Sequence, residues 1–236
     1  MSRAQKLKSG DVSLGLAHEW VCAFGRQGGT AAMLQQTIED SAAMQLIIDT
    51  IPRAPVVMPK ASHGTGITYD ATATRILGLP AECSDPAPET ADGEIVIYYG
   101  GWDLPALRTC TAGKKWMRQD QDWYDNKGWK AEPGYYRLLL PVPNSNRQRW
   151  GEQLQHLAGI DAAWQPAPIC IAATALLAHL METGQDLLRN DWCRCAEPLP
   201  GGFRAALTVL DGRVLVDYYW DDDPHVVLWL AASRKS

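Results

Sequence analysis

A short stretch near the C-terminus, Phe203 to Trp220, constrains the fold of this chain more than any other. At its centre, Asp211-Gly212 tolerates the positive φ angles that a two-residue type I′ turn requires. Such a turn fixes which residues face one another across the two strands. The pairs predicted on one face are Val209–Val214, Leu207–Val216, Ala205–Tyr218 and Phe203–Trp220. A slip of one residue would move every side chain to the opposite face, so both the hairpin and its register are predicted.

The remaining patterns predict an α+β protein. The segment from Pro168 to Thr183 is apolar nearly all round, has prolines where a helix start tolerates them, and precedes Gly184, a favoured C-terminal cap. A helix this apolar belongs in the interior. Strands are predicted at Glu94–Tyr99, Tyr135–Leu140, Trp192–Glu197 and Val226–Ala232, in addition to the hairpin. We therefore expect a mostly antiparallel or mixed sheet of five to six strands packed on the buried helix.

Three regions are expected along the chain. Residues 1–51 repeat apolar positions at helical spacing and predict a helical N-terminal unit. Residues 52–92 are interrupted by prolines and predict an irregular linker or a flap. Residues 93–236 contain the predicted strands and the apolar helix, and form the expected core domain.

Charge and hydropathy argue against several classes of protein. The net charge of −5 does not attract the whole molecule to nucleic acid or to an anionic membrane. Residues 1–10 lack the apolar run of a signal peptide. The longest apolar run, Ala167–Met181, has 15 residues, whereas a membrane span needs about 20. We expect a cytoplasmic protein that does not bind membranes, with its six cysteines reduced.

Two clusters are weak candidates for chemistry. Cys193 and Cys195 lie two residues apart on a predicted strand, so both thiols would point to one face and could reach one metal ion, although small residues packing on an inner face explain the pair equally well. Asp221, Asp223 and His225 form an acidic cluster beside a histidine, which suits a cation or acid–base catalysis. The same residues are typical of a turn between strands.

Cofactor motifs fail at essential positions. The Gly113-Lys114 dipeptide resembles part of a phosphate-binding loop, but Arg108 replaces its first glycine and Lys115 its hydroxyl residue. The sequence therefore predicts no cofactor, and no family is recognised from its motifs.

The most promising surface is rich in aromatic and basic residues. The chain has ten Trp and only two Phe, and several of these aromatic residues fall in a region predicted to be loop. Large aromatic and arginine side chains dominate protein interfaces. The candidate binding residues are Trp102, Trp116, Arg118, Trp123, Tyr124 and Trp129.

Two functions stay open at this point. We favour a non-enzymatic module that binds another protein through this aromatic and basic surface, with its oligomeric state open. The alternative is a hydrolase-like or metal-dependent enzyme with its site at Asp221, Asp223 and His225. Binding to nucleic acid is disfavoured by the net charge.

Overall fold

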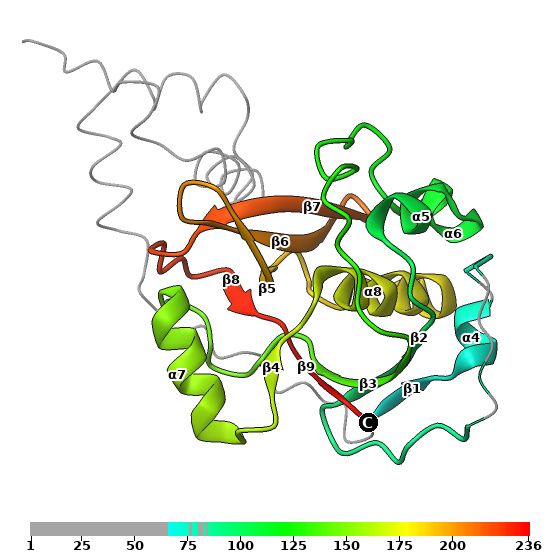
Figure 1. Ribbon diagram of the computed structural model, residues 1–236, viewed down its shortest axis with the longest axis horizontal. Coiled ribbons are helices and arrows are strands. Elements are labelled where there is room, and N and C mark those ends of the chain that lie inside the picture. The colour runs from blue at the N-terminus through cyan, green and yellow to red at the C-terminus, as the bar shows by residue number, and fades with distance from the viewer. Residues whose placement is uncertain (1–65, 76, 80–82, 84) are drawn as a thin grey trace, which may run out of the picture. The chain divides into compact units, whose positions relative to one another are not determined.

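The computed structural model describes residues 66–75, 77–79, 83 and 85–236 (Figure 1). These residues belong to one compact unit that spans residues 61–236. The helical unit predicted for residues 1–51, and part of the Pro-rich segment, lie outside the described residues.

The described chain combines short helices with mixed sheets, which confirms the α+β class. The helices are α4 (Ala71–Arg75), α5 (Leu104–Thr109), α6 (Thr111–Trp116), α7 (Trp150–Ile160) and α8 (Ile169–Thr183). The strands are β1 (Ile67–Tyr69), β2 (Ile95–Tyr99), β3 (Gly134–Leu139), β4 (Gln165–Pro166), β5 (Trp192–Leu199), β6 (Phe203–Leu210), β7 (Arg213–Trp220), β8 (Leu228–Leu230) and β9 (Ala232–Lys235).

Two sheets stand in place of the single sheet of five to six strands that the sequence predicts. One has the order β1-β2-β3-β9-β4 and the other the order β7-β6-β5-β8. β1 runs parallel to β2, and β8 runs parallel to β5, while the other neighbours are antiparallel. The sequence fails here because strand partners far apart in the chain leave no local pattern.

The C-terminal segment connects the two sheets. The single predicted strand Val226–Ala232 is split into β8 in one sheet and β9 in the other, with Ala231 between them. The Ala231 N–H donates to the carbonyl of Arg194 in β5, and the Ala231 carbonyl accepts from the N–H of Ala167, just after β4. One continuous stretch of chain therefore ties both sheets together.

The hairpin of β6 and β7 has the predicted register. All eight residue pairs from Phe203–Trp220 to Leu210–Arg213 are present. Asp211 and Gly212 have φ angles of 51° and 71°, which the predicted turn requires. Turn chemistry and alternation of side chains are sufficient to fix this element.

Helix α8 lies between the two sheets (Figure 1). It contacts β2 in one sheet and β5, β6 and β7 in the other, and every residue from Ile169 to Leu180 is buried. Gly184 follows with a φ of 68°, as predicted for the C-terminal cap. The all-round apolar sequence of this helix thus matches packing on more than one side.

Two elements of the described unit come from the predicted linker or flap. β1 pairs with β2, and α4 contacts both strands and α8. Tyr69 and Leu77 are buried within this part of the core. Part of the segment 52–92 is therefore built into the sheet.

Helices α5 and α7 begin with different caps. The Asp103 side chain accepts from the Ala106 N–H at the start of α5. Helix α7 starts at Trp150, where the Glu152 carboxylate accepts from the Arg149 N–H. The Ser145 hydroxyl, which precedes α7, accepts from the N–H of Leu230 in β8.

Candidate functional site: an aromatic row beside an acidic pocket

One face of the β6–β7 hairpin changes from buried to exposed along its length. Near the turn, Leu207 and Val216 are buried on this face. At the far end of the same face, Tyr218 and Trp220 are 46% and 56% exposed, and Phe203 is half-buried. The apolar face therefore continues beyond the part of the hairpin that the core covers.

Two tryptophans from the loop after α6 extend this exposed end. The ring of Trp123 contacts Tyr218 and Trp129, with centroids 5.6 and 5.9 Å apart. Phe203 contacts Tyr218 and Trp220, with centroids 5.1 and 5.4 Å apart. These contacts join Trp129, Trp123, Tyr218, Phe203 and Trp220 into one chain of rings, which we call the aromatic row.

The loop that carries Trp123 is attached to the edge strand β7 by hydrogen bonds. The Arg118 N–H donates to the Val214 carbonyl at 3.0 Å. Further on, the Gln121 carboxamide donates to the Val216 carbonyl at 2.6 Å and accepts from the Val216 N–H at 3.0 Å. The next outward N–H, that of Tyr218, donates to the carboxylate of Asp217 at 2.9 Å. The edge of β7 is thus occupied from Val214 to Tyr218.

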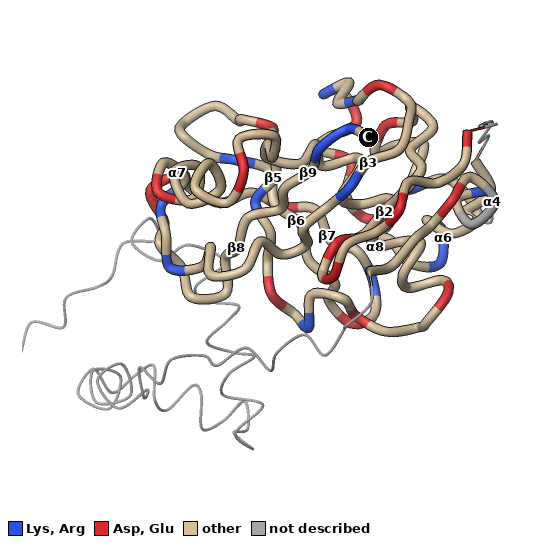
Figure 2. The backbone as a smooth tube through the Cα atoms, turned by 90° about the horizontal axis from the view of Figure 1, so that it is seen from below, with Lys and Arg blue, Asp and Glu red and all other residues tan. Residues whose placement is uncertain are grey.

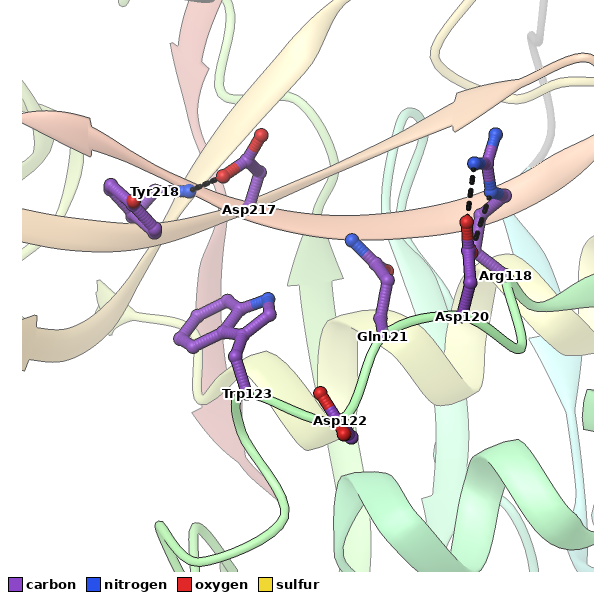
Figure 3. Close-up of a pocket in the computed structure, with 7 residues that line it drawn as sticks. All are labelled: Arg118, Asp120, Gln121, Asp122, Trp123, Asp217 and Tyr218. Atoms are coloured by element: carbon purple, nitrogen blue, oxygen red, sulfur yellow. Dashed lines mark hydrogen bonds and ion pairs between the residues drawn. The ribbon is translucent and has the colours of Figure 1, made fainter.

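A cavity of about 430 Å³ opens between this loop and β7 (Figure 3). Its lining residues are Arg118, Asp120, Gln121, Asp122, Trp123, Asp217 and Tyr218. Figure 3 shows the Gln121 and Trp123 side chains extending from the loop toward the strand. We call this cavity the acidic pocket, because three aspartates line it against one arginine.

Arg118 forms an ion pair with Asp120 within the pocket. Its Nε and Nη2 atoms donate to the two carboxylate oxygens of Asp120, at 3.1 and 2.9 Å. This pair lowers the pKa of the Asp120 carboxyl, so Asp120 stays ionised and its charge is offset by Arg118. Asp122 and Asp217 are the other two carboxylates that line the pocket.

Two of the predicted binding residues are not on the surface. Trp102 is 6% exposed and donates from its indole N–H to the Thr174 hydroxyl in α8. Tyr124 is 1% exposed, and burial raises the pKa of its phenol to about 12. Both rings are core residues: Trp102 lies between β2 and α5 and bonds to α8, and Tyr124 is buried within the loop after α6.

The other predicted binding residues remain partly accessible. Trp123 and Trp129 belong to the aromatic row, and Arg118 lines the acidic pocket. Trp116 lies apart from the row and packs beneath the Lys115 ammonium, 4.4 Å from the ring centroid.

Several of the cations near the row lie in ion pairs. They include Arg108 with Asp125 and Lys130 with Asp103. Figure 2 shows acidic positions interspersed with basic ones along the described chain. Counting cations in the sequence missed these pairings, since most form between residues far apart in the chain.

The acidic cluster predicted as a candidate catalytic or cation site lies at the turn after β7, where arginines donate hydrogen bonds to it. The carboxylate of Asp221 accepts two hydrogen bonds from Arg204, at 3.0 and 3.1 Å. The main-chain carbonyl of Asp223 accepts from Arg194, and that of His225 accepts from the Arg147 N–H. These contacts give Asp221, Asp223 and His225 a role in fixing the end of β7.

The predicted cysteine pair faces the interior. Cys193 and Cys195 are buried in β5, and burial raises the pKa of both thiols well above its usual range. Among the residues that the structure describes, no group of three His, Cys, Asp or Glu side chains could hold a metal ion. A protonated, buried thiol acts as a small apolar group, which is the packing alternative that the sequence allowed.

Sequence reasoning missed the hairpin half of the site. The predicted pairs Phe203–Trp220 and Ala205–Tyr218 are confirmed, but the predicted binding residues do not include Phe203, Tyr218 or Trp220. The available signal was the gradient along one face, from Val and Leu near the turn to three aromatic residues at the open end. Gln121 and Asp217 carried no such signal.

Comparison with known proteins gave no match to a family model, to a curated protein or to a solved structure. Among the described helices, none is long and apolar enough to cross a membrane.

Proposed function

We propose that this protein is a binding module that holds a segment of another protein on the aromatic row. The observation that carries the proposal is the exposure of Tyr218 and Trp220, at 46% and 56%, within a connected set of aromatic rings. Apolar surface of this kind is normally removed from water by folding or by a partner. Tyrosine and tryptophan are also the residues that contribute most to interface hot spots.

The surroundings of the row favour a protein ligand over an anionic one. The neighbouring pocket is lined by three aspartates, which repel phosphate groups and hence nucleic acid. The row also rests on a regular hairpin and on a loop bonded to its edge, so its rings are held in place before binding. A preorganised surface loses less conformational entropy when a partner binds.

The test is affinity capture from the source cells with three versions of the chain. Trp220→Ala removes the most exposed ring but leaves the Trp220 carbonyl available to Arg194. Ile160→Ala is the matched control, because Ile160 is 45% exposed at the end of α7 and outside the row. We expect one polypeptide to be retained by the wild type and by Ile160→Ala, and lost with Trp220→Ala.

Equal capture by all three versions would contradict the proposal. Circular dichroism and thermal unfolding of Trp220→Ala should match the wild type closely, because the side chain is mostly in water. A large loss of stability would make Trp220 a structural residue and would also count against the proposal.

A further inference from the structure

We infer that the acidic pocket binds an uncharged sugar, with the sugar hydroxyls on the polar side chains and its C–H groups against an aromatic ring. The pocket shares Trp123 and Tyr218 with the aromatic row, but Trp220, the most exposed ring of the row, does not line it. Sugar binding is thus a second activity, which goes beyond the proposed function and does not depend on a protein partner.

The wall of the pocket contains two kinds of side chain. Trp123 and Tyr218 contribute aromatic rings, and the other five residues contribute a guanidinium, a carboxamide and three carboxylates. Among the described residues, no aliphatic side chain lines this cavity, whereas pockets for apolar ligands are lined mostly by hydrophobic groups. A sugar has the matching surface, because each hydroxyl both donates and accepts hydrogen bonds. Its C–H groups are weakly positive and suit the negative face of an aromatic ring.

Two of the polar groups are held in place by the protein. The carboxamide of Gln121 is bonded to both main-chain groups of Val216, and the carboxylate of Asp120 accepts two hydrogen bonds from Arg118. Both groups keep capacity for a ligand, because a carboxamide has a second N–H and a second oxygen lone pair, and an ionised carboxylate has about four acceptor sites. Groups fixed before binding lose little conformational entropy when the ligand arrives.

Asp122 and Trp123 supply the remaining contacts. Within the part of the chain that the structure describes, no group donates a hydrogen bond to the exposed Asp122 carboxylate. Figure 3 shows the indole of Trp123 extending towards β7, with its ring nitrogen on the side of Gln121. A sugar held here donates one hydroxyl to Asp122 and accepts from the indole N–H with another. Asp217 points away from Gln121 and Asp122 in Figure 3, so we assign it no contact with the sugar.

The charges around the pocket favour a ligand without net charge. The carboxylates repel phosphate groups. Asp120 is paired with Arg118, and Asp217 has its own contacts, so a cation would meet Asp122 alone. A hydroxyl needs no charge to gain from these groups, because hydrogen bonds to a carboxylate are stronger than those between neutral groups. The volume of about 430 Å³ lies within the range of about 300–1,000 Å³ that is usual for ligand pockets.

The probes are the methyl glycosides of glucose, galactose, mannose and N-acetylglucosamine. Binding to the full chain is measured by tryptophan fluorescence and by saturation-transfer NMR of the glycosides. Adenine and methylguanidinium are the matched probes for a planar ligand and for a cationic one. We expect at least one glycoside to bind with a Kd of about 1 mM or tighter, and both matched probes to bind more weakly.

Three variants locate the sugar in the pocket. Asp122→Asn keeps one acceptor oxygen but removes the charge, and should weaken glycoside binding by about threefold. Trp123→Ala removes the ring and should weaken it by about tenfold. Trp123→Phe keeps an aromatic face without the indole N–H, and should lie between Trp123→Ala and the wild type. Asp92→Asn, at an exposed turn before β2, is the control and should change nothing.

Three results would overturn the sugar site. The first is that every glycoside binds more weakly than about 10 mM. The second is that adenine or methylguanidinium binds more tightly than all of the glycosides, which would make the ligand class wrong. The third is that Asp122→Asn and Trp123→Ala bind the glycoside as well as the wild type does, which would place the sugar elsewhere.

Trp220→Ala separates the sugar site from the proposed function. Because Trp220 does not line the pocket, this variant should keep its affinity for the glycoside while it loses the captured polypeptide. If it loses the glycoside as well, the sugar lies on the exposed end of the row and the pocket is not the site. Glycoside binding without capture of any polypeptide would support the sugar site and overturn only the protein-binding function.

Discussion

The carboxamide of Gln121 bonds to both the N–H and the carbonyl of Val216, as the backbone of a neighbouring strand would. Val216 lies in β7, the edge strand of its sheet. Exposed strand edges pair with other chains and promote aggregation. The Gln121 side chain therefore blocks this edge at Val216 and also positions the loop that carries Trp123.

Replacing Gln121 by alanine should open the edge of β7. We expect a loss of about 1–2 kcal/mol in the free energy of unfolding, because a part-buried N–H and carbonyl lose their partner. Chemical denaturation measures this loss, and amide exchange at Val216 should become faster. Gln155→Ala, on an exposed position of α7, should leave both measurements unchanged. An unaltered Val216 exchange rate in Gln121→Ala would show that the carboxamide does not protect the edge.

The buried Arg194 should be essential for folding. It is 0% exposed, and its guanidinium donates to the carbonyls of Gln148, Trp220 and Asp223 and to the Gln153 side chain. Burial lowers the pKa of this guanidinium to about 10, so it remains charged at neutral pH.

Arg194→Met should lower the free energy of unfolding by about 3–5 kcal/mol, because one buried and three part-buried oxygens lose their donor. Arg194→Lys should restore only part of this stability. The compact ammonium of lysine cannot reach all four acceptors, whereas the planar guanidinium of arginine does. Urea denaturation of the two variants provides the comparison. A cost below about 1 kcal/mol for Arg194→Met would mean that water replaces the guanidinium.

Glu197 should make stability depend on pH. Its carboxylate accepts from the Ile169 N–H at the start of α8, and burial raises the pKa of the carboxyl from 4.5 to about 7. Folded protein thus holds this proton more tightly than the unfolded chain does. The stabilisation is fully present below about pH 4.5 and is lost as the pH rises through about 7.

Glu197→Gln keeps a neutral acceptor at every pH. It should be more stable than the wild type above pH 7, by up to roughly 3 kcal/mol, and nearly equal to it below pH 4.5. Denaturant midpoints of both proteins, measured across this pH range, show whether Glu197→Gln is the more stable one at high pH. Glu197→Ala should be less stable than Glu197→Gln at all pH values, because Ile169 loses its acceptor. A difference in stability between Glu197→Gln and the wild type that does not change with pH would show that Glu197 does not titrate in this range.

Trp123 and Trp129 should matter for binding more than for stability. Both are partly exposed, and each ring contact contributes about 0.5–1.5 kcal/mol. Changing both to alanine should therefore cost little in thermal unfolding but abolish partner binding. The contrast is Trp102→Ala, which removes a buried ring and should cost about 3–5 kcal/mol. A double variant as unstable as Trp102→Ala would make the two rings core residues.

The sequence by itself determined the elements whose signals are local. The β6–β7 register follows from Asp211-Gly212 and from alternation, and α8 follows from a long apolar run that ends at Gly184. Each of these signals acts over one turn or one helix, so the local sequence is sufficient to interpret it.

The tertiary structure alone decided how the elements combine and which aromatic side chains are exposed to solvent. The split of the C-terminal segment into β8 and β9, the closure of β7 by Gln121, and the burial of Trp102 depend on partners far away in the sequence. Tryptophan is compatible with a core and with a binding surface, because its large ring is apolar and its N–H is polar. Only the packing around each ring distinguishes the two.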